Sequence, residues 1–225
     1  MIVKTRGIVL GYIKYGESSI IVKTYTHELG AVSLIVNSIR SQKAKRSIGY
    51  FQPFSLLELV LYVKESRDLQ RISEFKSYQP LHFIHQDMIK SSITLFLSEV
   101  LGKLVVAEQS PNHDLYGFLD GSIKSLEQLK AGVENFHLQF LLKLSDHLGY
   151  GLLDLEELFT SINQLSPDSI DLAELNNLYQ HDYGHVLKMN GVERNEILTA
   201  ILNFYRHHVE ISKVNSMEIL RKVLS

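Results

Sequence analysis

The spacing of the apolar residues changes once along this chain, at Pro80. Before Pro80, stretches rich in Ile, Val, Leu, Thr, Tyr and Phe are separated by short polar or glycine-containing turns, as in β-strands. After Pro80, the apolar residues recur every three or four positions, as in amphipathic helices. We therefore predict an α+β protein, with a β domain at residues 1–80 and an all-α helical bundle at residues 81–225. A length of 225 residues is enough for two domains.

Five strands are expected in the first domain, and Gly7 and Gly11 permit the first of them to bend sharply. Five bent strands in about 80 residues cannot leave both edges of a flat sheet open, and such sheets usually close into a small barrel. An OB-type barrel is the commonest result and an SH3-like barrel is the alternative, which periodicity does not exclude. The expected strands are Ile2–Tyr15, Ser19–Thr26, Ala31–Ser38, Phe54–Lys64 and Leu69–Tyr78.

The second domain begins with one long helix over residues 88–104, which carries a continuous apolar stripe. The apolar stretch in this helix is interrupted by Glu99, Gly102 and Lys103 and is too short to span a membrane, so a core helix is expected. Asp154, Asp171 and Ser216 are helix-entry signals, and Met189-Asn190-Gly191 is predicted to be a turn. Further helices are expected at about 114–130, 135–149, 155–163, 172–179, 194–211 and 216–224.

The composition excludes several kinds of protein. There is no cysteine, so disulfides, thiolate zinc sites, iron–sulfur clusters and cysteine nucleophiles are excluded. The N-terminal sequence MIVKTRGIVL lacks the layout of a signal peptide and has the alternation of a strand. A cytoplasmic protein is therefore expected.

The net charge of −2 conceals an uneven distribution of charge. Residues 1–80 contain 12 Lys and Arg against 6 Asp and Glu, a balance of +6. Residues 81–225 contain 11 against 19, a balance of −8. Such asymmetry indicates that the first domain meets polyanions.

A basic segment at residues 40–46 strengthens this expectation, because it places four cations in seven residues between two expected strands. Cations that neutralise phosphates supply affinity for nucleic acid that is independent of sequence and falls with salt. Aromatic rings near them are candidate platforms for bases, although each of these rings could equally fill the barrel core. The rings are those of Tyr12, Tyr15, Tyr25, Tyr50 and Phe51. The candidate DNA-binding residues are Lys4, Arg6, Tyr12, Lys14, Tyr15, Lys23, Arg40, Lys43, Lys45 and Arg46.

Catalytic and metal-binding patterns are weak. His181 and His185 have an i, i+4 spacing that suits zinc on a helix, but Gly184 and the missing glutamate of HExxH argue against a metal site. Acidic residues at Asp154, Glu156 and Glu157 match the first turn of a helix better than a carboxylate cluster. The sequence has no phosphate-binding GxxxxGK[ST], no GxGxxG after a strand and no GxSxG. We expect no catalytic residues, no cofactor and no metal.

The order and spacing of several short fragments resemble the RecO family of bacterial recombination mediators. In the first domain these are Thr5-Arg6-Gly7-Ile8-Val9-Leu10, Tyr15-Gly16-Glu17-Ser18, His27-Glu28-Leu29-Gly30, the basic segment, and Gln52-Pro53-Phe54-Ser55-Leu56-Leu57-Glu58-Leu59. In the second domain they are Phe140-Leu141-Leu142-Lys143-Leu144, Leu148-Gly149-Tyr150, and a terminal helix pair ending Lys213-Val214-Asn215-Ser216-Met217-Glu218-Ile219-Leu220.

This resemblance implies an N-terminal OB-fold and a C-terminal helical domain. It also implies binding of single- and double-stranded DNA, strand annealing, and help in loading the RecA recombinase onto strands covered by single-stranded DNA-binding protein. RecR and the acidic tail of single-stranded DNA-binding protein are the implied partners, and the bacterial nucleoid is the implied place of action. None of these steps consumes a nucleotide, so the resemblance implies a protein that is not an enzyme.

Two further expectations follow from the resemblance. Several members of the family carry a four-cysteine zinc site after the Leu-Gly-Tyr region, which this chain cannot build, so apolar packing must replace it. The residues expected to supply that packing are Leu152, Leu153, Leu155, Leu158, Phe159 and Ile162. An acidic tail with an aromatic end needs cations beside an apolar groove. The candidates for that partner site are Phe204, Tyr205, Arg206, Lys213, Arg221 and Lys222.

Two other functions are compatible with the residues. One is a metal-dependent hydrolase of nucleic acid that acts through the acidic domain. The other is a scaffold with no affinity for DNA.

Overall fold

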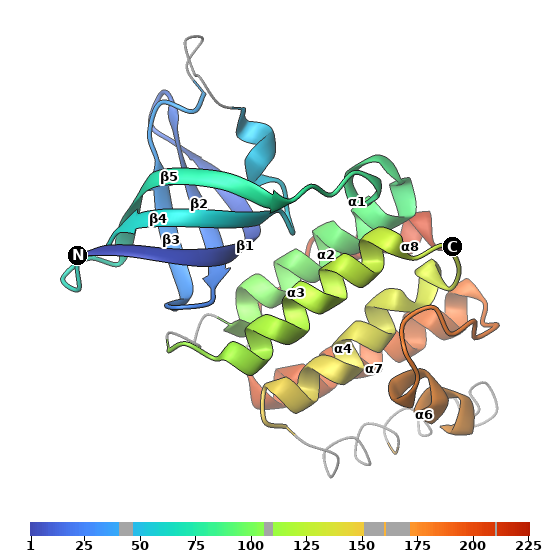
Figure 1. Cartoon of the computed structure of the whole chain (residues 1–225). Helices are drawn as coiled ribbons and strands as arrows, with labels where there is room; N and C mark the ends of the chain where they lie inside the picture. The colour runs from blue at the N-terminus through green and yellow to red at the C-terminus, as the bar shows by residue number, and fades with distance from the viewer. Residues whose placement is uncertain (41–46, 106–109, 151–159, 161–171, 210) are drawn as a thin grey trace. The chain divides into compact units, whose positions relative to one another are not determined.

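The computed structural model describes residues 1–40, 47–105, 110–150, 160, 172–209 and 211–225. It has a closed five-stranded barrel followed by a helical region, so the predicted fold class is confirmed (Figure 1).

The chain divides into two compact units. Met1–His82 and Leu97–Asp120 form the first, and Phe83–Phe96 and Gly121–Ser225 form the second. The helices α2 and α3 therefore each contribute residues to both units. The predicted domain boundary at Pro80 stays a prediction.

The barrel has the strand order β1-β2-β3-β5-β4, and β4 pairs again with β1. β3 and β5 are parallel and the other neighbours are antiparallel. This topology is that of the OB-fold and not of an SH3-like barrel. Each strand begins and ends within two residues of its expected bounds. The strands are β1 Ile2–Tyr15, β2 Ser19–Thr26, β3 Gly30–Val36, β4 Leu56–Tyr62 and β5 Leu69–Gln79.

Strand β1 closes the barrel because it pairs with two neighbours. Its first half, from Ile2 to Ile8, pairs with β4, and the part from Gly7 onward pairs with β2. The register with β2 shifts between Val9 and Gly11, and Gly11 has a φ of +142°, which other residues rarely adopt. The bulge bends β1, so the strand contributes to two outer faces of the barrel.

The barrel interior is filled by aliphatic and aromatic side chains from all five strands and from the segment after β3. Phe51 comes from a short 3-10 turn, Ile48–Phe51, which was not predicted, and its ring packs 4.8 Å from that of Phe75. The buried cluster comprises Val9, Ile20, Val22, Leu34, Val36, Ile39, Phe51, Leu57, Leu59, Leu61, Ile72 and Phe75.

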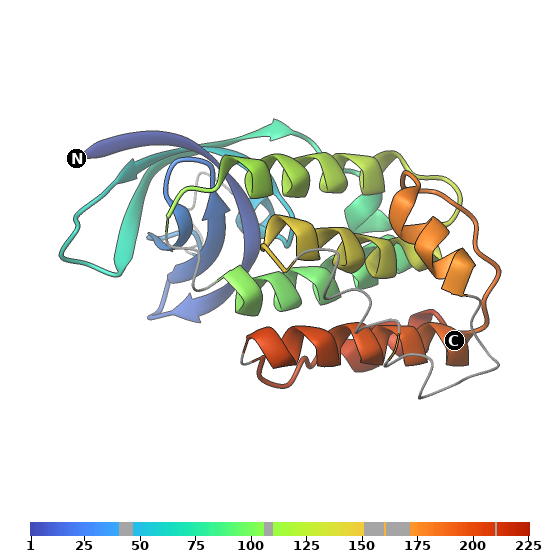
Figure 2. The same cartoon turned by 90° about the horizontal axis from the view of Figure 1, so that it is seen from below.

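The helical region has seven α-helices in the residues that the structure describes, and α4 lies at its centre. Nine of the twelve residues of α4 are buried, and the helix contacts α6 and α7 (Figures 1 and 2). None of the described helices is long and apolar enough to cross a membrane. The helices are α1 Phe83–Gln86, α2 Met88–Leu104, α3 His113–Gln128, α4 Phe136–His147, α6 Leu172–Gln180, α7 Gly191–His208 and α8 Met217–Val223.

Helix α7 begins earlier than expected. The Asn190 side chain accepts hydrogen bonds from the backbone N–H groups of Val192 and Glu193, and the Glu193 carboxylate accepts one from the Asn190 N–H. This capping box makes Asn190 the helix N-cap and Gly191 the first helical residue, so the turn predicted at Met189-Asn190-Gly191 is wrong. Helix α1 was not predicted from the sequence, because its four residues are too few for a periodic pattern.

Within the first unit, a hydrogen-bond chain joins β5 to the first half of α3. The Tyr78 hydroxyl donates to the Asp120 carboxylate at 2.5 Å and lies 3.2 Å from the Tyr116 hydroxyl. Burial, followed by the hydrogen bond to Asp120, raises the pKa of Tyr78 far above its ordinary value, so the phenol stays a donor. The Arg6 guanidinium lies 4.8 Å from the centre of the Tyr78 ring.

We predict that Tyr78→Phe destabilises the first unit by about 1 to 3 kcal/mol, because the Asp120 carboxylate loses a donor in a partly buried place. Urea unfolding measures the effect. Tyr15→Phe deletes an exposed hydroxyl from the same barrel and is expected to stay within about 0.5 kcal/mol of the parent. Equal effects of the two substitutions would show that the chain of hydrogen bonds does not stabilise the unit.

In the second unit, His137 is fully enclosed on α4, and its ring lies edge-on to Phe96 at 6.1 Å. Burial, followed by the positive charge of Arg194, lowers the pKa of His137 from 6.5 to about 3. The unfolded chain thus takes up a proton below about pH 6.5, whereas the folded chain does so only near pH 3. The stability that His137 contributes is complete above pH 6.5 and is lost as the pH falls toward 3.

We predict that the parent loses about 2 kcal/mol more than His137→Gln between pH 7 and pH 5, because glutamine does not titrate. Urea unfolding at the two pH values measures this difference. His207→Gln replaces an exposed histidine of α7 and is expected to keep the loss seen in the parent. The explanation fails if His137→Gln and the parent respond alike to pH.

Candidate nucleic-acid interface

Strand pairing places side chains on two outer faces of the barrel. We call the first the hairpin face, formed by the second half of β1 with β2, β3 and the adjoining ends of β5 and β4. We call the second the pocket face, formed by the first half of β1 with β4 and the second half of β5. The hairpin face comprises Ile13, Tyr15, Ile21, Lys23, Ser33, Ile35, Tyr62 and Arg71. The pocket face comprises Lys4, Arg6, Glu58, Val60, Glu74 and Lys76.

An apolar belt crosses the hairpin face. Ile13 pairs with Ile21, Ile21 with Ile35, Ile35 with Arg71, and Arg71 with Tyr62. Directly paired residues point to the same side of a sheet. Their sequence neighbours in β2 and β3 are buried in the barrel, so the belt points outward. Ile13 is 61% exposed and Tyr62 is 48% exposed, and none of the five belt residues was among the sequence-based candidates.

Cations flank this belt. Lys23 pairs with Gly11 and Ser33 in the row beside the belt, and Arg71 lies within it. Neither Lys23 nor Arg71 forms an ion pair with another residue that the structure describes. Lys14 pairs with the buried Ile20 and therefore lies on the other side of the same hairpin, near its end.

Arg40 fixes the start of the basic segment beside the β1–β2 turn. Its backbone N–H donates to the Ser18 carbonyl at 2.9 Å, and its guanidinium donates to the carbonyls of Gly16 and Ser19 at 3.2 and 3.4 Å. The basic segment therefore begins, at Arg40, beside the end of the hairpin. The predicted DNA-binding residues Lys43, Lys45 and Arg46 lie outside the described residues.

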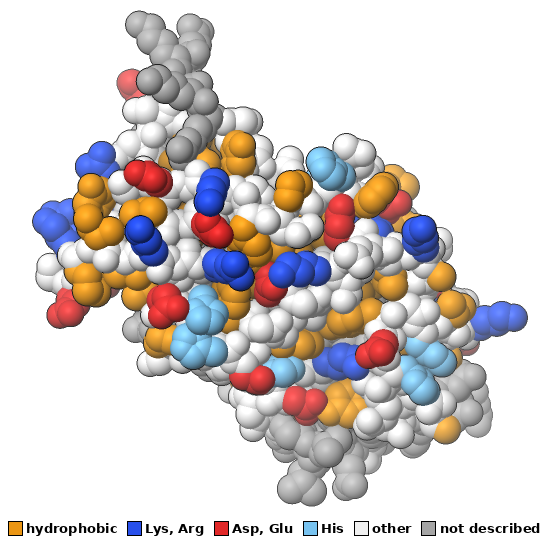
Figure 3. Space-filling view, in the orientation of Figure 1, with side chains coloured by type: hydrophobic (Ala, Val, Ile, Leu, Met, Phe, Trp, Pro, Cys, Tyr) orange, Lys and Arg blue, Asp and Glu red, His pale blue; other side chains and the backbone are white. Residues whose placement is uncertain are grey.

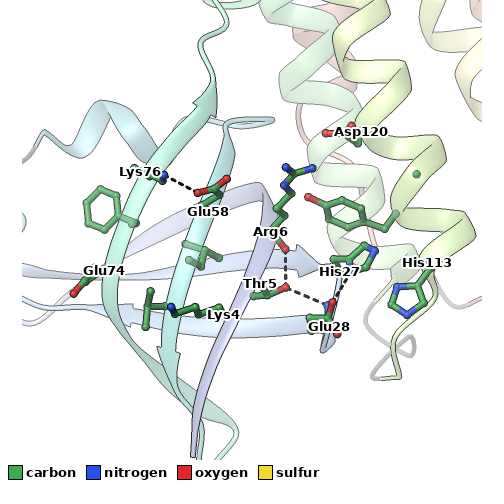
Figure 4. Close-up of a pocket in the computed structure, with 15 residues that line it drawn as sticks. Lys4, Thr5, Arg6, His27, Glu28, Glu58, Glu74, Lys76, His113 and Asp120 are labelled. Atoms are coloured by element: carbon green, nitrogen blue, oxygen red, sulfur yellow. Dashed lines mark hydrogen bonds and ion pairs between the residues drawn. The ribbon is translucent and has the colours of Figure 1, made fainter.

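The pocket face borders a pocket of about 800 Å³, whose far wall is the first half of α3 (Figure 4). Two predicted DNA-binding residues, Lys4 and Arg6, line it. Lys76 Nζ lies 2.9 Å from Glu58 Oε2, and the hydrogen bond from Lys76 lowers the pKa of Glu58, with a further contribution from Arg6. In the space-filling view, blue and red side chains are interspersed over β4 and β5 (Figure 3).

The formal charges of the two faces differ in sign. The pocket is lined by three Lys and Arg and by four Asp and Glu, a balance of −1 with neutral histidines. Residues 11–26, 30–40, 60–62 and 69–72, which form the hairpin face and its margins, contain four Lys and Arg and one acid, Glu17, a balance of +3. The cations of the first domain are therefore divided between a compensated face and a positive one.

Histidine and tyrosine rings form one end of the pocket. The His27 ring lies 4.2 Å from the His113 ring and 5.2 Å from that of Tyr116. His27 Nδ1 lies 2.7 Å from the Glu28 carboxylate. The backbone N–H of Glu28 donates a hydrogen bond to the Thr5 hydroxyl at 3.1 Å. These contacts hold the β2–β3 turn against β1 and α3 within the first unit.

The aromatic candidates differ in exposure. Tyr25 and Phe51 are fully buried in the barrel, which is the structural role that the sequence left open for them. Tyr12, Tyr15 and Tyr50 present their rings to solvent, with Tyr15 half exposed. Tyr15 lies on the hairpin face, two residues from Ile13, whereas Tyr12 pairs with the buried Val22 and lies on the other side of the hairpin.

The six candidates for the partner site also differ in their exposure to solvent. Phe204 and Tyr205 are buried, and the Tyr205 hydroxyl donates to the Leu141 carbonyl at 2.6 Å. Arg221 donates to the Thr199 hydroxyl at 3.0 Å. The three remaining candidates are exposed cations, namely Arg206, Lys213 and Lys222. The assignment of a partner to these residues stays a prediction.

The rings of His181 and His185 stack at 4.9 Å in the segment after α6. Among the described residues, no group of three or more His, Asp or Glu is arranged to hold a metal ion. Several further candidates lie outside the described residues. They are Asp154, Glu156, Glu157, Leu152, Leu153, Leu155, Leu158, Phe159 and Ile162.

Comparison with known proteins agrees with the fold. The family model described as "Recombination protein O N terminal" matches residues 1–81, and "Recombination protein O C terminal" matches residues 85–157. The chain is 36% identical to the DNA repair protein RecO of Bacteroides fragilis over 241 residues, with 99% of each chain covered. It is 33% identical to that of Flavobacterium johnsoniae over 239 residues and 31% identical to that of Flavobacterium psychrophilum over 240, each with complete coverage of both chains. The chain therefore belongs to the RecO family of DNA repair proteins.

Proposed function

We propose that this chain is a recombination mediator that binds DNA through the hairpin face and the basic segment of its barrel. The observation that carries the proposal is the charge of +3 on the hairpin face and its margins, next to the start of the basic segment at Arg40. Phosphates are attracted by concentrated cations, and each neutralised phosphate releases counterions.

The pocket face is the less favourable place for DNA. Lys4 and Arg6 were predicted to bind DNA, but the carboxylates of Glu58, Glu74 and Asp120 line the same pocket. A phosphate placed there lies near acidic as well as basic side chains, so its attraction to the lysine and arginine residues is largely offset by repulsion from the carboxylates. The proposal therefore rests on Lys23, Arg71 and Arg40 together with Lys43, Lys45 and Arg46.

The wider role follows from the family. We infer that the chain anneals complementary strands and helps to load RecA onto strands covered by single-stranded DNA-binding protein, in partnership with RecR and with the acidic tail of that protein. The bacterial nucleoid is then its place of action. The barrel supplies the affinity for DNA, and the helical region supplies surfaces for other proteins. Neither role requires a catalytic residue.

We predict that Lys23→Glu weakens binding of a fluorescent single-stranded oligonucleotide by about tenfold at low salt and lowers the salt slope by about one. Fluorescence anisotropy over a series of salt concentrations measures both. The matched control is Lys4→Glu, which makes the same change of charge on β1 in the pocket face and is expected to change the Kd by less than about twofold.

The combined variant Lys43→Glu, Lys45→Glu and Arg46→Glu is expected to remove most of the remaining affinity, because three phosphate contacts are lost together. Binding that is insensitive to salt would contradict the proposal. So would a Lys4→Glu variant that loses as much affinity as Lys23→Glu.

A further inference from the structure

The pocket face has a cavity that the proposed function leaves without a ligand. Its volume of about 800 Å³ lies within the range of ligand-binding sites. Its walls are the outer side of β1, β4 and β5 and the first half of α3, all within the first unit (Figure 4). The lining contains three Lys and Arg and four Asp and Glu. Such a lining is complementary to a ligand that carries charges of both signs.

Two rows of side chains cross the barrel wall of this pocket. In one row the charge of Glu58 is compensated within the chain, because Lys76 Nζ lies 2.9 Å from Glu58 Oε2. In the other row Lys4 pairs with Val60, and Val60 pairs with Glu74. Neither Lys4 nor Glu74 forms an ion pair with another residue that the structure describes. The second row therefore presents one uncompensated cation and one uncompensated anion, with an aliphatic side chain between them.

The wall formed by α3 has open space where a side chain would ordinarily lie. Gly117 lines the pocket inside this helix, and a Cβ at this position would have no other described part of the chain within 4 Å. Glycine inside a helix is destabilising relative to alanine, and the packing of the described chain does not require it here. Because glycine has no side chain, it allows the backbone of another molecule to approach α3 closely.

We propose that the pocket face is a docking site for an amphipathic helix of a partner protein. The helix places an acidic residue opposite Lys4, an aliphatic residue opposite Val60 and a basic residue opposite Glu74. The inference goes beyond the proposed function, which places DNA on the hairpin face and gives the pocket no role.

The spacing of the second row favours a helix as the occupant. Lys4 and Glu74 are two interstrand spacings apart, which is about 10 Å. Residues i and i+7 of a helix lie on one face and are also about 10 Å apart, with residue i+4 between them. An extended segment fits less well, because the residues on one of its faces are about 7 or 13 Å apart.

The charges of the pocket disfavour other occupants. DNA or a purely acidic peptide would be attracted to Lys4 but would also lie against Glu28, Glu74 and Asp120. A purely basic segment would lie against Lys4 and Arg6. Among the described residues, no group of three or more His, Asp or Glu is arranged to hold a metal ion. A protein segment with one charge of each sign avoids all of these repulsions.

The first test uses synthetic helical peptides of about 16 residues, rich in alanine and held helical by a lactam bridge. The mixed peptide carries Glu, Leu and Arg at positions i, i+4 and i+7, and two others carry Glu or Arg at both charged positions. We predict that the protein binds the mixed peptide about fivefold more tightly than either other peptide, because each of those brings two like charges together. Fluorescence anisotropy at low salt measures the three Kd values. Equal affinities, or no binding of any peptide, would overturn the proposal.

Reversal of one charge in the pocket is expected to change which peptide is preferred. Lys4→Glu leaves two acids in the row and is expected to prefer the peptide with two Arg over the mixed peptide by about fivefold. Glu74→Lys is expected to prefer the peptide with two Glu by a similar factor of about five. Unchanged preferences in these variants would contradict the docking site.

The same variants separate this proposal from the proposed function. If Lys4→Glu loses affinity for the single-stranded oligonucleotide, the proposed function fails, whereas the exchange of peptide preference still supports the docking site. An excess of the oligonucleotide is expected to leave the mixed peptide bound to the parent protein. Displacement of the peptide would assign the pocket to DNA and would overturn the proposal.

A second test fills the pocket without changing any charge. Gly117→Leu is expected to weaken binding of the mixed peptide by about tenfold, because the new side chain occupies the space that the partner helix needs. The matched control is Gly121→Leu, one turn later on α3, where a Cβ also has nothing within 4 Å but does not line the pocket. The control is expected to change the Kd by less than about twofold. Thermal unfolding verifies that both variants are folded, and equal losses of affinity in the two would overturn the proposal.

Discussion

The double pairing of β1 is the constraint on which the barrel and both of its outer faces depend. One strand of fourteen residues must pair with β4 and then with β2, and the bulge at Gly11 supplies the bend between the two pairings. A side chain at Gly11 would have to adopt a φ that is costly for any residue with a Cβ. Gly7 contributes in another way, because a Cβ at this position would lie only 2.7 Å from Leu59 Cδ1. Closure therefore depends on two glycines in one strand.

The same bend divides the cations of the barrel between two electrostatically different faces. Lys4 and Arg6 precede the bulge and share the pocket face with Glu58 and Glu74. Lys23 is carried by β2, which pairs with the part of β1 that follows the bulge. A domain with a formal balance of +6 thus has a compensated face and a positive face, and only the second can attract a polyanion strongly.

The sequence predicted the strands well because each is a short apolar run between clear turn residues. It also contained one part of the belt: a three-residue turn between Tyr15 and Ser19 places Ile13 opposite Ile21 in the hairpin. The remaining pairs could not be predicted. Ile35 meets Arg71 through the parallel pairing of β3 with β5, whose register depends on the closure of the whole barrel. Local periodicity carries no information about such a long-range contact.

Whether the other candidate residues are buried or exposed also could not be predicted from the sequence. Tyr25 is fully buried and Tyr15 is half exposed, but both lie in apolar runs that do not show which residues face the core. Helix α1 was missed because its four residues make only about one helical turn, and a periodic apolar pattern needs several turns to be recognised. The electrostatic surroundings of Lys4 also could not be predicted. They include the carboxylates of Glu58 and Glu74, which are more than fifty residues away in the chain and come near Lys4 only because β1 pairs with β4 and β4 pairs with β5.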